Sequence, residues 1–174
     1  MDQWLLNRQV PLHIVAVAGL VYKDDKVLLI RSENKGWEIT GGVLEQGEKL
    51  LDGLQREIFE ESGIKALPLN MVGVYQRLSF KKGYGLLEGT ILPPTVNFTF
   101  RCRYLSGQPQ TSDESLEVGW FTPQEAKEKI SDPYIRQTLI DILQYEDHQF
   151  FRSFIIDGQG QKVFLEDCAL KVSD

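Results

Sequence analysis

The stretch Gly41–Ile64, GGVLEQGEKLLDGLQREIFEESGI, decides the fold of this chain because it joins a glycine turn to a strongly patterned helix. From Lys49 to Ser62 apolar residues recur at helical spacing, which predicts a helix with one side packed on a core. These apolar residues are Leu50, Leu51, Leu54, Ile58 and Phe59. Gly63 follows, and a glycine just after a helix is a typical stop signal. The sequence therefore predicts a loop, a helix and a loop in one continuous segment.

The predicted helix also carries three glutamates beside its apolar stripe. Glu57 and Glu61 are one turn apart and Glu60 is three residues after Glu57, so the carboxylates lie on adjoining ridges. Three such charges repel one another, and a hard divalent cation with oxygen ligands relieves that repulsion. Gly53 falls on the same arc and is expected to leave room for a ligand. A solvated surface with Arg56 as an ordinary ion partner is the alternative explanation.

A longer pattern covers the same stretch. The pattern G-x5-E-x7-R-E-U-x-E-E-x-G-U, where U is aliphatic, is filled without departure by Gly42, Glu48, Arg56, Glu57, Ile58, Glu60, Glu61, Gly63 and Ile64. Chance would produce this match in a chain of this size less than about one time in a million. The stretch resembles the signature of the Nudix hydrolase family, and the resemblance extends from about Ile14 to Ile130 and weakly beyond.

The resemblance implies a set of metal and catalytic residues. In Nudix hydrolases divalent cations on the signature helix bridge a diphosphate while water attacks phosphorus. Carried across by position, Glu57, Glu60 and Glu61 are implied metal ligands and catalytic residues, and the Gly41 carbonyl is a further ligand. Arg56 and Glu48 are implied to orient the glutamates, which puts Arg56 in the catalytic set. Mg²⁺ is the expected ion, with Mn²⁺ as the alternative.

A general base and substrate contacts are also implied by the resemblance. Family members often carry an acid ahead of an aromatic strand, which points to Glu114 as base and further metal ligand, with Glu117 as second choice. Arg31, together with the backbone of Gly41 and Gly42, is expected to contact substrate. Weaker candidates for substrate contact are the cations Lys35, Arg77, Lys81 and Lys82 and the aromatic residues Tyr22, Trp37, Phe80 and Tyr84.

The expected function is metal-dependent hydrolysis of a diphosphate bond. Metal ions neutralise the charge that makes a phosphoanhydride inert and lower the pKa of bound water. The implied substrate is a nucleoside diphosphate linked to another moiety, such as a nucleoside triphosphate, ADP-ribose or a sugar nucleotide. The alternative is a Nudix-like module that senses a nucleotide sugar without cutting it.

Composition restricts the partners that this chain is expected to have. Its 174 residues suit one domain with a substantial core. A net charge of −6 without a basic run argues against nucleic acid or an anionic membrane as partner. Cys102 and Cys168 lack metal-site spacing and form no disulfide framework. The first residues lack a signal pattern, so a cytoplasmic location is expected.

Strand and helix signals mix along the chain and predict an α/β sandwich, which agrees with the mixed sheet between helices that the resemblance implies. Predicted strands cover residues 13–22, 27–30, 37–40, 69–80 and 118–121, and the alternation over 96–104 predicts a strand with one buried face. Residues 81–94 are expected to form a loop. Helices are predicted after Thr122 and Asp132. A C-terminal hairpin over about 149–167 is expected to extend the single domain of residues 1–174, and to cover the site or pair two subunits as a homodimer.

Overall fold

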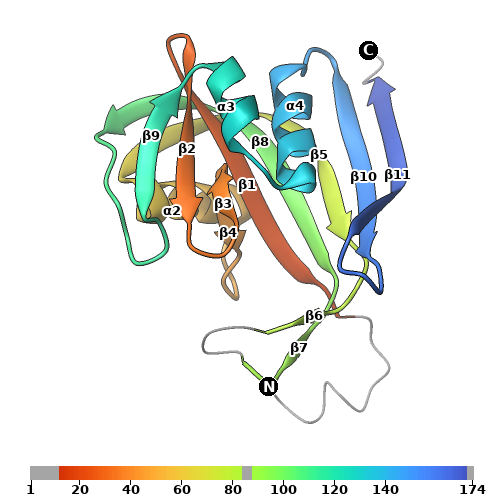
Figure 1. The fold of residues 1–174 in the computed structure, drawn as a ribbon. Coiled ribbons are helices and arrows are strands. Elements are labelled where there is room, and N and C mark those ends of the chain that lie inside the picture. Colours follow the sequence, from red (N-terminus) through yellow and green to blue (C-terminus); the bar gives the residue numbers. More distant parts are fainter. Residues whose placement is uncertain (1–11, 84–87, 172–174) are drawn as a thin grey trace.

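The computed structural model describes residues 12–83 and 88–171 and confirms the predicted α/β/α sandwich (Figure 1). The described residues form a mixed sheet of nine strands in the order β11-β10-β5-β8-β1-β2-β3, with β4 beside β1 and β9 beside β2. The strands are β1 (Ile14–Lys23), β2 (Lys26–Ser32), β3 (Gly36–Glu38), β4 (Thr40–Val43), β5 (Ile64–Arg77), β8 (Thr95–Gly107), β9 (Glu117–Phe121), β10 (His148–Ile156) and β11 (Lys162–Lys171). The helices are α2 (Leu50–Ser62), α3 (Pro123–Lys129) and α4 (Pro133–Leu143).

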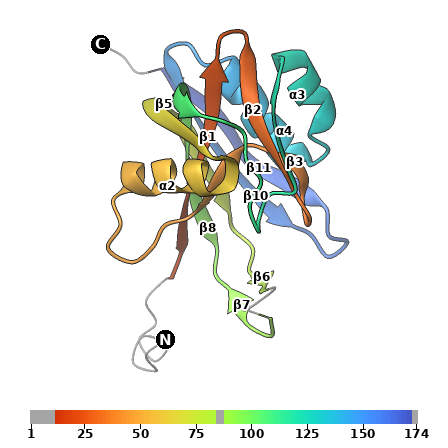
Figure 2. The ribbon, with the colours of Figure 1, turned by 90° about the vertical axis from the view of Figure 1, so that its left-hand side faces the viewer.

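The helices cover the sheet on both faces, with α2 on one side and α3 and α4 on the other (Figure 2). The apolar layer under α2 includes Val17, Val21, Leu28, Leu54, Ile58, Phe100 and Cys102. The opposite layer includes Ala18, Leu20, Leu29, Ile130, Leu139 and Ile142. Alternate residues of β1 and β2 therefore enter different layers. This explains why both strands read as continuous apolar runs in the sequence.

The prediction of one buried face for the strand now seen as β8 was wrong. Phe100 and Cys102 enter the layer under α2, as the alternation indicated. Thr99, on the other face of the same strand, is also fully buried. Helices on both sides of the sheet remove both faces of a central strand from water, which period-two alternation alone does not reveal.

The core-facing stripe of α2 is narrower than predicted. Leu54 and Ile58 are fully buried, whereas Leu51 and Phe59 are 46% and 48% exposed. Gly63 ends the helix in the left-handed conformation, with φ of 71°, and its N–H donates to the carbonyl of Phe59 at 2.8 Å. The predicted end of the helix is confirmed.

Several strand boundaries differ from the prediction. The strand predicted over residues 37–40 is divided into β3 and β4, and β4 continues through Gly41 and Gly42. Strand β5 begins at Ile64 rather than at Leu69. The expected loop over residues 81–94 contains two short paired strands, β6 (Lys81–Lys82) and β7 (Ile91–Leu92). Tyr84 lies outside the described residues.

Both predicted capped helices are confirmed. Thr122 and Glu125 form a reciprocal capping box at the start of α3. Asp132 accepts hydrogen bonds from two backbone N–H groups at the start of α4, and Pro133 occupies the first helical position. No helix in the described part of the chain is both long and apolar enough to cross a lipid bilayer.

The C-terminal hairpin is continuous with the main sheet. Strand β10 pairs in parallel with β5, and β11 pairs antiparallel with β10 at the sheet edge. Phe150 of β10 belongs to the apolar layer under α3 and α4. The hairpin is therefore packed into the sandwich on the side of β5 (Figure 1).

Candidate active site

Strand β4 brings two glycines against the glutamate face of α2. A Cβ at Gly42 would overlap the carboxylate of Glu57, so a larger residue would displace that side chain. Gly41 has φ of 152°, and a Cβ there would overlap the carbonyl oxygen of Val17. The N–H of Gly41 donates to the Glu61 carboxylate at 2.7 Å. Glycine at position 41 therefore lets β4 lie this close to β1, and glycine at position 42 lets the Glu57 carboxylate lie this close to the backbone.

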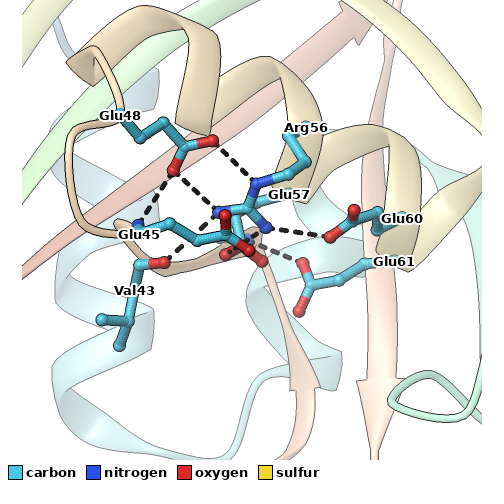
Figure 3. A network of polar contacts seen from close by, with 8 residues as sticks. Val43, Glu45, Glu48, Arg56, Glu57, Glu60 and Glu61 are labelled. Atoms are coloured by element: carbon cyan, nitrogen blue, oxygen red, sulfur yellow. Dashed lines mark hydrogen bonds and ion pairs between the residues drawn. The ribbon is translucent and has the colours of Figure 1, made fainter.

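Arg56 gathers several carboxylates into one network (Figure 3). Its Nε and Nη2 donate to the two oxygens of Glu48 at 2.8 and 2.9 Å, in the two-point geometry that suits a guanidinium. Its Nη1 donates to Glu57 at 3.0 Å and to Glu60 at 2.9 Å. Glu48 also accepts from the N–H of Glu45, and these bonds hold the pKa of Glu48 at about 2. Arg56 thus joins the loop before α2 to the glutamates on the helix.

Two of the three predicted metal-ligand glutamates are buried. Glu57 and Glu61 are 8% and 7% exposed. Burial raises the pKa of both carboxyl groups, and that of Glu61 reaches about 8 although the Gly41 N–H opposes the rise. A raised pKa shows that the available positive charge does not offset the cost of burying the ionised form. Glu60 differs, because its side chain is 57% exposed.

A loop far along the chain brings Glu114 to the same region. The hydroxyl of Ser115 donates to the carbonyl of Glu61 at 2.6 Å, and the N–H of Gln110 donates to the carbonyl of Ser62 at 2.9 Å. These bonds attach the loop before β9 to the end of α2. The negative charge of the exposed Glu114 contributes to the raised pKa of Glu57, so the two carboxylates are within electrostatic reach.

Arg31 and Glu117 lie on the opposite face of the sheet. Arg31 lies on the same face of β2 as Val27, and Glu117 lies on the same face of β9 as Phe121. Val27 and Phe121 pack into the layer under α3 and α4. Arg31 donates to Glu117 through Nε at 2.7 Å, and both side chains are more than one third exposed. Glu114 in the loop is therefore within electrostatic reach of Glu57, whereas Glu117 in β9 lies on the other face of the sheet.

Glu38 is a buried carboxylate near this site that the sequence did not single out. Its oxygens accept from the Ser32 hydroxyl and from the Lys35 ammonium, the latter at 2.9 Å. Its charge raises the pKa of Glu61. Glu38 pairs with Ile30 across β3 and β2, on the face that carries α2. The sequence signal that could have identified Glu38 is its position between Trp37 and Ile39, because a charged residue is unusual in a short apolar strand that leads to the glycines.

The space expected beside Gly53 is already filled. A Cβ there would overlap Leu44 and come within 2.7 Å of a Glu48 oxygen. The absence of a side chain at Gly53 therefore admits the Glu48 carboxylate and the preceding loop, and not a ligand.

The chemistry of the donors at this site suits a hard divalent cation. Glu57 and Glu61 are buried carboxylates short of positive charge, and oxygen ligands of this kind bind Mg²⁺. Among residues 12–83 and 88–171, no three Asp, Glu, His or Cys side chains already converge as a metal site. Arg56 bonds to both Glu57 and Glu60, and the Gly41 N–H donates to Glu61.

Comparison with known proteins agrees with this arrangement. The sequence model of the NUDIX domain matches residues 12–141, which include β4, α2 and the loop that carries Glu114. A MutT-like protein of Streptomyces ambofaciens is 38% identical over 126 residues, covering 71% of this chain and 73% of that protein. The 8-oxo-dGDP phosphatase NUDT18 of Homo sapiens is 30% identical over 115 residues, covering 62% of this chain. The chain spans 31% of the length of that second relative.

Solved structures share the architecture. The crystal structure of a MutT protein from Bacillus halodurans aligns with a TM-score of 0.70 over 90% of this chain and 97% of that one. Sequence identity in that alignment is 22%, so the likeness concerns the fold.

Proposed function

The chain belongs to the NUDIX domain family of hydrolases, and on this premise we propose that it hydrolyses the diphosphate bond of a nucleoside diphosphate linked to another moiety. Members of the family generally use divalent metals, and we propose Mg²⁺ here, with Mn²⁺ able to replace it. The observation that carries the proposal is the pair of buried carboxylates, Glu57 and Glu61, packed against Gly41 and Gly42 with too little positive charge to offset them.

We assign Glu57, Glu60 and Glu61 and the Gly41 carbonyl as the groups that would hold the metal. Such an ion neutralises phosphate charge and lowers the pKa of a water molecule. Arg56 positions Glu57 and Glu60 by donating to both from Nη1. Glu48 fixes the guanidinium by accepting from its other two nitrogens, Nε and Nη2. We also assign the backbone of Gly41 and Gly42 to a contact with the substrate.

Glu114 is the proposed general base, and a further metal ligand in the assembled complex. A base must come within hydrogen-bond reach of the water that it deprotonates. Glu114 is exposed on a loop that is bonded to the end of α2, and its charge acts on Glu57. We assign Arg31 to a contact with the substrate beyond the diphosphate, because it faces the side of α3 and α4.

The alternative is a sensor that binds a nucleotide sugar without turnover. The complete set of glutamates favours the enzyme, since a sensor has no need for a metal-activated water. A panel assay separates the two: the protein is incubated with Mg²⁺ and nucleoside triphosphates, ADP-ribose, sugar nucleotides or dinucleoside polyphosphates, and released monophosphate is measured. We expect turnover of at least one class. Tight binding of one compound without turnover of any would favour the sensor.

We further propose that residues 1–174 act as one domain that includes the C-terminal hairpin. Strand β10 supplies Phe150 to the core, which supports a single folding unit. The edge strand β11 exposes Leu165 and Leu170, which supports pairing of two chains through this edge. Light scattering of the intact protein and of a variant shortened after His148 tests both points. An unchanged mass and unchanged activity after the truncation would reject them.

A further inference from the structure

The loop that joins β8 to β9, residues 108–116, runs past α2 (Figure 1) and is tied to the end of that helix. Ser115 is fully buried, and its hydroxyl donates to the carbonyl of Glu61 at 2.6 Å. Glu61 is the second-last residue of α2, and the last carbonyls of a helix have no partner within it. Ser115 therefore completes the end of the helix with a hydroxyl from 54 residues further along the chain.

Ser112 extends this connection to Glu114. A serine hydroxyl has one hydrogen, and Ser115 gives its hydrogen to Glu61, so Ser112 is the donor in the 3.1 Å contact between the two hydroxyls. The Ser112 oxygen accepts from the backbone N–H of Glu114 and from that of Ser115, both at 3.2 Å. A continuous series of hydrogen bonds thus runs from the N–H of Glu114 through two hydroxyls to the carbonyl of Glu61.

The carboxylate of Glu114 depends on this backbone connection for its position. It is exposed, and no group within residues 12–83 and 88–171 forms a hydrogen bond or ion pair with its oxygens. Burial raises the pKa of Glu57 and the negative charge of Glu114 adds to the rise, so the two carboxylates repel each other. The bonds of the two serines therefore hold the backbone of Glu114 near α2 against a repulsion between side chains.

We propose that Ser112 and Ser115 are positioning residues, which hold Glu114 where it can deprotonate the water that attacks the diphosphate. This inference rests on the proposed hydrolysis with Glu114 as its base. A general base contributes about a hundredfold to ten-thousandfold to the rate. A displacement of about 1 Å in a catalytic group can cost about a hundredfold. Loss of either hydroxyl should therefore lower kcat and leave KM unchanged, because neither serine is assigned to a contact with the substrate.

The test is a double-mutant cycle of Ser115→Ala with Glu114→Gln, measured on the compound of the panel with the highest turnover. Ser115→Ala should lower kcat by about tenfold or more and change KM by less than about twofold. In the Glu114→Gln background the same substitution should change kcat by less than about twofold, because the base that it would displace is already lost. A serine that only supports the fold would lower kcat by the same factor in both backgrounds.

Ser112→Ala is a second variant, because Ser112 is only partly buried and its loss leaves the bond between Ser115 and Glu61 in place. It should also lower kcat, and Ser112→Thr should restore kcat, since the hydroxyl remains. Thr111→Ala is the matched control, because it removes an exposed hydroxyl from the same loop, and it should keep the kcat and KM of the intact protein. Hydrogen exchange of the metal-free protein, followed by mass spectrometry, should be faster over residues 112–116 in both serine-to-alanine variants and unchanged in the control.

Unchanged exchange or unchanged kcat in Ser115→Ala, or an equal loss of kcat in both backgrounds, would overturn the positioning role. Normal kcat of Glu114→Gln would also overturn it and leave the proposed hydrolysis standing. If the intact protein turns over no compound of the panel, the proposed hydrolysis fails, and the cycle is measured on the Kd for Mn²⁺ by electron paramagnetic resonance. Weaker Mn²⁺ binding by Ser115→Ala that disappears in the Glu114→Gln background would then support the positioning of Glu114. The same change in both backgrounds, or none, would overturn it.

Discussion

Two arginines in this protein each hold several acids, and their surroundings differ. Arg56 bonds to Glu48, Glu57 and Glu60, all within one segment of the sequence. Arg152 of β10 bonds through two nitrogens to the fully buried Asp141 of α4, at 2.6 and 2.7 Å, and also pairs with Asp167 of β11. The hydroxyl of Tyr75 donates to Asp141 as well.

The difference lies in the balance of charge. At Arg152 one buried cation meets one buried anion, because Asp167 is 72% exposed. Around Arg56 the acids outnumber the cation, and burial, together with the charges of Glu38 and Glu57, raises the pKa of Glu61 to about 8. A balanced buried pair joins elements, here the hairpin to α4. A network with more acids than cations, such as the one around Arg56, leaves carboxylates able to bind a metal cation.

The largest effect is expected from breaking the balanced pair. Arg152→Ala leaves Asp141 buried without its cation, which should lower the free energy of unfolding by about 3–5 kcal/mol in urea titrations. The activity per folded molecule should not change. Asp167→Asn is the control, and loss of this exposed partner should cost less than about 1 kcal/mol. Wild-type stability of Arg152→Ala would contradict the structural role of the pair.

The second largest effect is expected on the activity of the site around Arg56, where the acids outnumber the cation. Glu61→Gln should lower kcat by about a hundredfold or more, or about 2.7 kcal/mol, because the metal loses a charged ligand. Circular dichroism should show an intact fold. Glu128→Gln, on the exposed surface of α3, is the control and should keep full activity. A Glu61→Gln enzyme with normal kcat would remove Glu61 from the metal site.

The pH dependence of stability should also distinguish the two networks. In the unfolded chain Glu61 ionises near the ordinary glutamate pKa of 4.5, whereas in the folded chain burial raises its pKa to about 8. Between these values the folded state binds more protons, so stability without divalent metal should fall as pH rises. The slope has an upper limit of about 1.4 kcal/mol for each pH unit. Thermal melts of Glu61→Gln should show a flatter profile, and an equal slope in both proteins would contradict the assignment.

The smallest effect is expected at the exposed pair on the other face of the sheet. Arg31→Gln and Glu117→Gln should each cost less than about 1 kcal/mol of stability, because the ion pair is exposed. If Arg31 contacts substrate, only Arg31→Gln should also raise KM, by about fivefold, or about 1 kcal/mol. Steady-state kinetics measure KM for both variants. Equal KM values for Arg31→Gln and Glu117→Gln would exclude Arg31 from the substrate site.

Local signals in the sequence predicted the parts of the site that lie close together in the chain. The helical spacing of Leu54, Glu57, Ile58 and Glu61 fixes which residues share a face of α2, whatever it packs against. Gly63, Thr122 and Asp132 mark helix ends through their own backbone and side-chain chemistry. These predictions are confirmed because helix geometry relates residues three and four positions apart.

The sequence by itself determined α2, its acids and the alternation of strands and helices. Only the tertiary structure decided that Glu57 and Glu61 are buried, that Glu38 and the loop of Glu114 approach them, and that Leu51 and Phe59 stay exposed. It also placed Lys162 of β11 beside the ring of Tyr134 in α4. The physical reason is that burial and electrostatic reach depend on contacts between segments far apart in the chain, and these contacts leave no periodic pattern within any one segment.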